Sequence, residues 1–169
     1  MEEEFRPVAI NPNYQVSNFG RILNIKTNVF LNPYLSGKNN KYRRIDLGKH
    51  QQYYIHRLVA IAFIDNPNNC PCVDHINTDT FNNHVSNLRW CSIAENNRNK
   101  SMNKNNTSGY KGVTFSKRAN KWVATCSVNG KLKAIGLYAN ILDAVAARLQ
   151  AVNETYRDFT HHTERLVCV

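Results

Sequence analysis

Residues 73–96 read VDHINTDTFNNHVSNLRWCSIAEN. This stretch opens on a short apolar-flanked segment that carries Asp74 and His75, continues through a loop crowded with Asn and Asp, and returns to an alternating pattern over residues 87–91. Apolar and polar residues that alternate between clusters of turn-forming residues are typical of short β-strands. The stretch therefore predicts two short strands joined by a polar loop.

A helix signal follows the second strand. Ser92 is a favourable N-cap residue, and Glu95 stands three residues later, at the spacing of a capping box. The pattern predicts a short helix over residues 93–99. We therefore expect the order strand, loop, strand, helix between residues 70 and 99, with Asn96 on the helix.

These elements carry residue types that suit phosphodiester cleavage. The reaction needs a base that deprotonates water and a divalent cation that neutralises charge on the phosphoryl and leaving oxygens. His75 has an ordinary pKa near neutrality and can act as the base. Asp74 and Asn96 can supply hard oxygen ligands, which suit Mg²⁺ or Mn²⁺ better than Zn²⁺. Asn87 does not titrate, so we expect it to hydrogen-bond the loop and fix the orientation of His75.

A purely structural interpretation is also open at this point. A lone His-Asp pair is often a surface ion pair, and Asn-rich segments are commonly turns. The residue types alone therefore leave catalysis and a structural role as alternatives.

The chain before this stretch divides into a β-rich segment and a helix. Short alternations between residues 5 and 52 are broken by turn residues, which predicts a small antiparallel β unit. This segment carries a basic cluster, Arg43 and Arg44, beside a tyrosine. Residues 56–63 are compatible with a helix that ends at Asp65-Asn66-Pro67.

A polar linker follows the short helix. Residues 97–108 contain almost no apolar side chain. Arg98, Lys100 and Lys104 lie in this region and could track DNA phosphates. A passive hydrophilic linker is the alternative.

The last segment changes pattern again. It contains three strand-like runs and then a helix, at residues 110–116, 121–128, 131–138 and 142–156. Asn129-Gly130 between the second and third runs is the strongest short hairpin signal. We expect a three-stranded antiparallel sheet with one helix packed on it.

The charge of the chain points to a polyanionic partner. Lys and Arg number 22 against 12 Asp and Glu, which gives a formal net charge of +10 over 169 residues. Nucleic acid is the commonest partner of such a protein, although a merely soluble basic protein is the alternative. Hydrophobic residues make up 42% of the chain, which argues against general disorder.

Compartment signals are consistent with access to nucleic acid. Residues 1–4 are acidic and no apolar run follows them, so we expect no secretory signal. The longest apolar stretch, residues 58–64, is too short to cross a bilayer. The cysteines form an odd, scattered set: Cys70, Cys72, Cys91, Cys126 and Cys168. We therefore expect a reduced, intracellular protein that is neither secreted nor in a membrane.

Two further features leave alternatives. Cys70, Cys72 and Cys91 with a nearby histidine could form a zinc site, but the spacing is Cys-x-Cys and no second pair follows. We therefore do not expect structural zinc, and interpret these cysteines as small apolar residues in a reduced core. His56 opens the apolar helix, where it could contact DNA, cap the helix or pack.

Taken in order, the residues between 55 and 100 resemble an HNH homing endonuclease of the phage and intron-encoded type. The positions that carry the resemblance are Ile55-His56-Arg57-Leu58-Val59-Ala60, Phe63, Pro67, Val73-Asp74-His75-Ile76, Asn82-Asn83, Asn87-Leu88-Arg89-Trp90 and Glu95-Asn96. The resemblance implies a ββα-metal core in which Asp74 and Asn96 are metal ligands and His75 is the general base. Asn87 would be the middle Asn that supports the core.

One residue departs from this pattern. Phe81 stands where relatives usually carry a polar residue, and it removes no candidate site group. Residues 14–22 resemble the small module that precedes such nuclease cores and whose implied role is DNA contact. Arg43 and Arg44 are the best candidates for that contact, with a solvated charged turn as the alternative.

The C-terminal segment resembles the DNA-binding domain of plant ethylene-response factors. The matching runs are Ser108-Gly109-Tyr110-Lys111-Gly112-Val113, Lys121-Trp122-Val123-Ala124, Ile135-Gly136-Leu137-Tyr138 and Asp143-Ala144-Val145-Ala146-Ala147. The resemblance implies a three-stranded sheet, backed by one helix, that enters the DNA major groove. Lys111 matches a DNA-contacting basic position of that family.

Other positions of this segment depart from the plant pattern. Polar uncharged residues stand where plant members often carry Arg or Glu: Thr114, Ser116, Thr125 and Ser127. Base readout is therefore expected to differ. Basic residues remain as candidate phosphate contacts: Lys117, Arg118, Lys131 and Lys133. We expect Trp122 to pack against the helix rather than stack on DNA.

The sequence as a whole predicts an α+β protein that cuts double-stranded DNA. The expected parts are an N-terminal β-rich DNA-binding module (1–54), an HNH core (55–100), a linker (101–108), a sheet-plus-helix DNA-binding domain (109–157) and a tail (158–169). Arg89, within the core, is a further candidate DNA contact. We expect a metal-dependent homing-type endonuclease, and a monomer that nicks DNA, with a dimer or sequential nicks as the route to double-strand cutting. A non-cleaving regulator with a structural HNH core and an RNA-directed nuclease are the alternatives.

Overall fold

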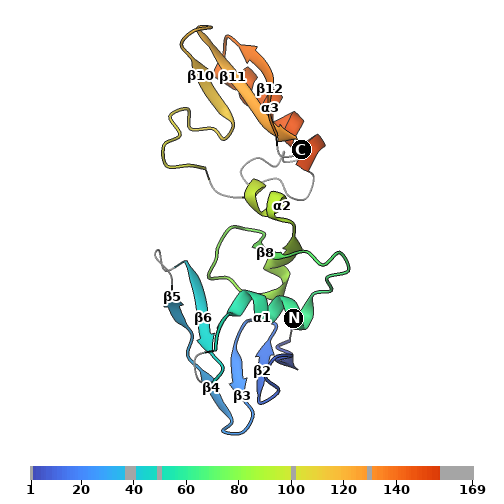
Figure 1. Ribbon diagram of the computed structural model, residues 1–169. Coiled ribbons are helices and arrows are strands. Elements are labelled where there is room, and N and C mark those ends of the chain that lie inside the picture. Colours follow the sequence, from blue (N-terminus) through green and yellow to red (C-terminus); the bar gives the residue numbers. More distant parts are fainter. Residues whose placement is uncertain (1, 37–40, 49–50, 100–101, 129–130, 157–169) are drawn as a thin grey trace. The chain divides into compact units, whose positions relative to one another are not determined.

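The computed structural model describes residues 2–36, 41–48, 51–99, 102–128 and 131–156 (Figure 1). The chain forms two compact units, Met1–Ile93 and Ala94–Val169. Both combine helices with antiparallel sheets, so the predicted α+β class is confirmed. Within the described residues no helix is long and apolar enough to cross a membrane.

The first unit begins with a four-stranded antiparallel sheet. Its strands follow one another in order: β1 (Phe5–Pro7), β2 (Tyr14–Ser17), β3 (Ile22–Asn24) and β4 (Val29–Leu31). The pairing of Val16 with Ile22 across β2 and β3 points both side chains to one face, where each is almost completely buried. This face forms one wall of the unit's core.

A second, three-stranded sheet leads directly into the central helix. Its strands are β5 (Tyr34–Ser36), β6 (Tyr42–Asp46) and β7 (Gln52–Tyr54). Helix α1 (Ile55–Phe63) starts at the next residue and ends before the predicted Asp65-Asn66-Pro67 breaker. Figure 1 shows α1 between the N-terminal sheet and the hairpin that follows it.

The apolar face of α1 is the centre of a single core cluster. Leu58, Val59 and Ala60 are buried on this helix, whereas Ile61 on the opposite face is 50% exposed. The cluster also takes residues from both sheets and from the next hairpin: Val8, Val16, Ile22, Ile45, Leu47, Ile55, Val73 and Leu88. Because one helix contacts all of these elements, they are held as one body.

The stretch that carries the candidate site folds as predicted. β8 (Cys72–His75) pairs antiparallel with β9 (Leu88–Cys91), and the intervening loop ends in a short 3-10 helix, η1 (Val85–Asn87). The short helix α2 (Ile93–Arg98) follows. The predicted order of strand, loop, strand and helix is therefore confirmed.

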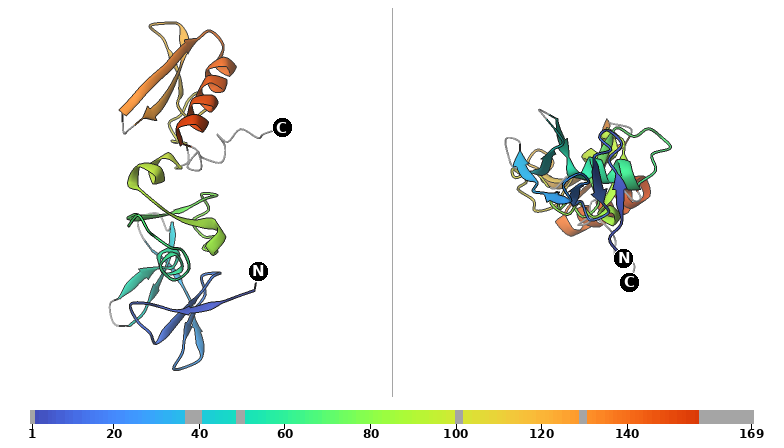
Figure 2. Two further views of the ribbon diagram at one scale, coloured as in Figure 1. Left: turned by 90° about the vertical axis from the view of Figure 1, so that its right-hand side faces the viewer. Right: turned by 90° about the horizontal axis from the view of Figure 1, so that it is seen from below.

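The second unit contains the predicted three-stranded sheet and helix. The elements are β10 (Val113–Ser116), β11 (Lys121–Val128), β12 (Lys131–Tyr138) and α3 (Ile141–Tyr156). Val113, Ala124 and Ala144 form the centre of the core between sheet and helix, and Trp122 packs against it, as predicted. Figure 2 shows α3 along one face of this sheet. The Asn129-Gly130 hairpin signal lies outside the described residues.

The first strand of this sheet is shorter than the predicted run from residue 110. Gly112 has a φ of +70°, and a Cβ there would stand 2.7 Å from the Thr125 carbonyl oxygen. A glycine allows this close approach and ends the extended pattern. The strand therefore begins at Val113.

The contrast between the two faces of α1 gives a stability test. We expect Leu58→Ala to lower the free energy of unfolding of the first unit by about 2–5 kcal/mol, because it opens a cavity in a filled core. Ile61→Ala, on the exposed face of the same helix, should cost less than about 1 kcal/mol. Urea unfolding of the full chain would measure both, and equal losses would contradict the described packing.

Candidate active site

His75 lies at the end of β8 and is only 4% exposed. Its Nε2 lies 3.2 Å from Oδ1 of Asn83. The Asn83 Nδ2 donates to the Phe81 carbonyl oxygen at 3.3 Å, which turns Oδ1, an acceptor, toward the imidazole. Nε2 therefore carries the proton in the neutral ring, and the lone pair lies on Nδ1.

An aromatic wall surrounds this imidazole. The ring of His56, from the first turn of α1, lies 5.1 Å from the His75 ring between centroids, edge to face. Tyr42 of β6 lies 6.2 Å from His75 and 5.2 Å from His56. Tyr54 completes the group at 5.3 Å from His56. The second sheet thus builds one side of the site around His75.

Asp74 points to the other side of β8 and forms a buried ion pair. It is 6% exposed, and its Oδ2 accepts hydrogen bonds from Nε of Arg89 at 3.0 Å and from Nη2 at 2.8 Å. The two residues are direct cross-strand partners in the β8–β9 hairpin. The arginine fixes the carboxylate in one orientation and compensates its charge.

Asn87 fastens both ends of the polar loop. Its Oδ1 accepts from the backbone N–H of Asn77 at 3.1 Å, and its Nδ2 donates to the carbonyl oxygen of Asn82 at 2.8 Å. Its backbone carbonyl accepts from Ile76 N–H at 2.8 Å. Asn87 therefore holds the loop as predicted from its residue type, while the hydrogen bond to the His75 ring comes from Asn83.

Burial keeps both histidines of the site uncharged near neutrality. Burial lowers the pKa of His75, partly opposed by the Asn83 hydrogen bond and by the charges of Asp74 and Asp79. Burial, with smaller contributions from His75 and Arg57, lowers the pKa of His56 to about 3. The His56 Nδ1 is also buried without a hydrogen-bond partner among the described residues.

The predicted metal ligands are both oxygen donors. Asp74 offers a carboxylate in the first unit, and Asn96, on α2 in the second unit, offers an amide oxygen. A carboxylate and an amide match the ligand preference of Mg²⁺ or Mn²⁺. Among the described residues, no group of three or more His, Cys, Asp or Glu side chains is placed to hold a metal ion. The joint role of Asp74 and Asn96 stays a prediction.

The chain is similar in sequence to known HNH endonucleases. No family model matches the chain. An uncharacterised HNH endonuclease of Acanthamoeba polyphaga mimivirus is 36% identical over 91 residues, which cover 53% of this chain and 28% of that protein. The DNA endonuclease I-HmuI of Bacillus phage SP01 is 38% identical over 81 residues, or 46% of this chain and 45% of that one. The chain is homologous to HNH endonucleases.

The fold is also similar to that of an HNH endonuclease. A solved structure of the homing endonuclease I-HmuI, concerned with its DNA binding and cleavage, matches with a TM-score of 0.52 and 25% identity. The match covers 95% of this chain and 94% of that chain. In contrast, the matched segments span less than half the length of the curated HNH relatives named above. The resemblance of the C-terminal segment to ethylene-response factors stays a prediction.

The predicted DNA contacts of the first unit differ in their surroundings. Arg43 is exposed, with its guanidinium 6.0 Å from the Phe81 ring centroid. Arg44 is half-buried, stacks 4.2 Å over the Tyr54 ring and donates to its hydroxyl. The third, Arg89, is held by Asp74. Of the three, Arg43 is the most open to a polyanion.

In the second unit most predicted DNA contacts are exposed. These residues are Lys104, Lys117, Arg118, Lys131 and Lys133. Lys111 instead donates from Nζ to the backbone carbonyl of Arg98 at 2.6 Å, near the end of α2, and Arg98 itself is half-buried. Lys100 lies outside the described residues.

Sequence reasoning did not assign the groups that touch His75. The sequence pattern includes Asn83 but gives it no role, and it leaves three alternatives open for His56. The structure gives His56 the packing alternative and adds Tyr42 and Tyr54 beside it. The Asn-rich loop after His75 is a sequence signal from which Asn83 could be named as a contact of His75. The position of the two tyrosines beside the histidines becomes visible only in the folded β6–β7 hairpin.

The buried His56 predicts a loss of stability in acid. Its folded-state pKa lies far below that of the unfolded chain, so the unfolded state binds more protons between these values. Stability should be full above about pH 6.5 and fall by about 1.4 kcal/mol per pH unit below it. His56→Phe should reduce this slope between pH 6.5 and 4.5 in urea unfolding. Leu58→Ala is the control, since it should lower stability equally at each pH; an unchanged slope in His56→Phe would contradict the assignment.

Proposed function

We propose that this protein is a metal-dependent endonuclease of the HNH homing type that acts on double-stranded DNA. The observation that carries the proposal is a buried, oriented His75 next to a charge-compensated Asp74 in a chain homologous to HNH endonucleases. The homologues described above are named as endonucleases, and the net charge of +10 suits a polyanionic substrate.

His75 is the general base in this proposal. Its ring is neutral near pH 7 because burial lowers its pKa, and Asn83 holds the Nε2–H. Nδ1 then accepts a proton of the attacking water while the water oxygen bonds to phosphorus, the bond from phosphorus to the leaving 3′-oxygen breaks, and solvent protonates that oxygen. The packing of the His56 ring and the loop fixed by Asn87 keep the imidazole in one orientation.

Asp74 and Asn96 are the residues that would hold a Mg²⁺ or Mn²⁺ ion. When bound, such an ion would neutralise charge on the phosphoryl and leaving oxygens. Arg89 holds Asp74 from one side through two N–H groups, so the carboxylate enters the site in a fixed orientation.

The remaining parts would bind the duplex. Arg43 on β6 and the exposed lysines and arginine of the second unit are the proposed phosphate contacts. With one such centre among the residues that the structure describes, we expect a monomer that nicks one strand. The viral and phage relatives favour a mobile genetic element as its setting, and action on DNA inside a host cell.

Removal of the base tests the function directly. We expect His75→Ala to lower the single-turnover rate of nicking by about 100-fold or more while DNA binding survives. Supercoiled plasmid carrying long native phage DNA would be incubated with Mg²⁺ or Mn²⁺, with chelator as the control. Cleavage by the wild type should be metal-dependent and should decline only at a pH below the ordinary histidine pKa of about 6.5, because burial lowers the pKa of His75. Equal cleavage by His75→Ala would exclude this base, and tight binding without any cutting would favour a DNA-binding regulator.

Arg43 and Arg44 give a matched pair for DNA contact. Arg43→Ala should weaken DNA binding and reduce the slope of log affinity against log salt by about 1. Arg44→Ala should instead lower thermal stability, because Arg44 packs on Tyr54. Fluorescence anisotropy at several salt concentrations, with thermal melts, would separate the two; a normal slope in Arg43→Ala would remove it from the interface.

A further inference from the structure

The turn between β2 and β3 docks on the loop that precedes η1. The backbone carbonyl of Asn18 accepts a hydrogen bond from Val85 N–H at 2.8 Å. One residue further along the turn, the Phe19 ring packs edge-on against His84, with 4.6 Å between centroids. The turn and the loop therefore run antiparallel to each other, so Gly20, the next residue of the turn, faces Asn83.

The third contact is made by Gly20. Its φ is +86°, and a Cβ built there would lie 3.0 Å from Cβ of Asn83 and 3.0 Å from Cγ2 of Ile55. Both distances are shorter than ordinary carbon–carbon contacts. The absence of a side chain at position 20 therefore lets the turn press directly against Asn83.

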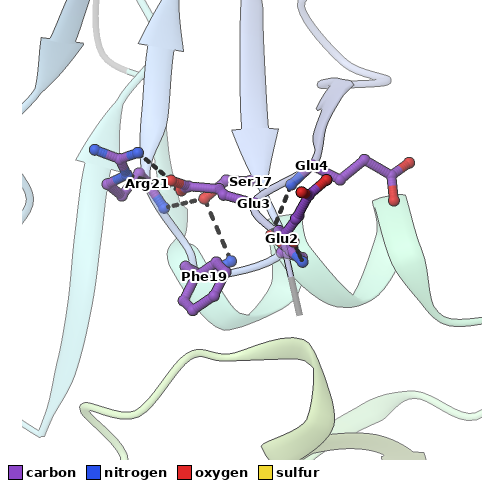
Figure 3. Close-up of polar contacts among 7 residues, drawn as sticks. Glu2, Glu3, Glu4, Ser17, Phe19 and Arg21 are labelled. Carbon is purple, nitrogen blue, oxygen red and sulfur yellow. Dashed lines mark hydrogen bonds and ion pairs between the residues drawn. The ribbon is translucent and has the colours of Figure 1, made fainter.

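The turn is itself a tightly bonded structure. Ser17 Oγ accepts from the N–H groups of Phe19 at 3.3 Å and of Arg21 at 3.0 Å (Figure 3). The Arg21 guanidinium pairs with Glu3, and Asn18 Oδ1 accepts from Glu4 N–H at 3.0 Å. The surface opposite Asn83 is therefore rigid rather than a loose loop.

Asn83 in turn contacts the base of the proposed reaction. It is 5% exposed, donates to Phe81 O and accepts at Oδ1 from the His75 ring. A one-ångström shift of its side chain would lengthen the 3.2 Å contact beyond hydrogen-bond range and release the imidazole.

We propose that Asn83 is the positioning residue that fixes the tautomer and orientation of His75, and that the Gly20 turn of the N-terminal sheet holds Asn83 in place. This inference rests on the proposed function for its catalytic consequence. The N-terminal sheet then has a role in the chemistry besides any contact with DNA. Asn83 acts through His75 and does not touch the substrate.

Two pairs of variants of the full chain test the proposal. Asn83→Leu keeps the number and branching of the side-chain heavy atoms but removes the acceptor, and should lower the single-turnover nicking rate about 10–100-fold with DNA affinity unchanged. Asn83→Asp keeps an oxygen toward Nε2–H and should recover most of that rate. Asn68→Leu, the same change at an exposed asparagine outside this loop, should nick at the wild-type rate.

The turn is tested by a pair of glycines. Gly20→Ala should reduce nicking about 10-fold because its Cβ displaces Asn83. Gly48→Ala, with a φ of +119° and only Gln51 Oε1 at 4.0 Å from the added Cβ, carries a comparable backbone strain without that contact. It should nick at the wild-type rate. Equal losses in both variants would assign the effect to strain and overturn the coupling.

A readout independent of cleavage separates this inference from the proposed function. Long-range ¹H–¹⁵N NMR spectra of histidine-labelled protein report which nitrogen of His75 is protonated. The wild type should show the Nε2–H form, and Asn83→Leu and Gly20→Ala should show a mixture of tautomers. If the wild type never cuts DNA but the two variants show the mixture of tautomers, the proposed function fails. The coupling from Gly20 through Asn83 to His75 is then still supported. Unchanged spectra in both variants, with nicking at the wild-type rate, would overturn the inference.

Discussion

The structure has to bury two charged or titratable side chains, Asp74 and His75, on a hairpin too small to support them. β8 and β9 contain four residues each, and an isolated two-stranded hairpin is marginally stable in water. The hairpin gains its core through Val73 and Leu88, which join the cluster centred on α1. The two N-terminal sheets, through α1, therefore serve as the scaffold of the site rather than as separate attachments.

Burial then requires a partner for each polar group, because an unpaired buried group costs about 1–3 kcal/mol. Arg89 supplies the partner for Asp74, and Asn83 supplies one for His75. The His56 imidazole, beside His75, is one exception, since its Nδ1 has no partner among the described residues. Its position 5.1 Å from the His75 ring gives a reason to keep it uncharged, because a second cation there would oppose protonation of the base.

Most of the helices and strands could be predicted from the sequence, because hydrophobic periodicity, helix-capping residues and turn residues are local signals. The α1 helix, the strand-loop-strand-helix order around His75 and the sheet and helix of the second unit were all recovered within a few residues. The partners of the site residues could not be predicted in the same way. The Asp74–Arg89 pair depends on the β8–β9 register. The position of Tyr42 and Tyr54 in the aromatic wall around His75 depends on the packing of β6 and β7 beside α1. Asn83 meets Gly20 through a contact that spans more than sixty residues of chain.

The same limit explains why basic residues in a sequence are weak evidence for DNA contact. Arg89 and Lys111 both counted toward the positive charge, yet one is bound to Asp74 and the other to a helix carbonyl. A buried or internally bonded cation compensates charge within the fold and releases few counterions when DNA binds. In the second unit the exposed charge is concentrated at the β10–β11 turn and on β12, at Lys117, Arg118, Lys131 and Lys133. Together with the exposed Arg43 and Lys104, those positions, rather than the total of +10, are the ones we expect to set how strongly DNA binding depends on salt.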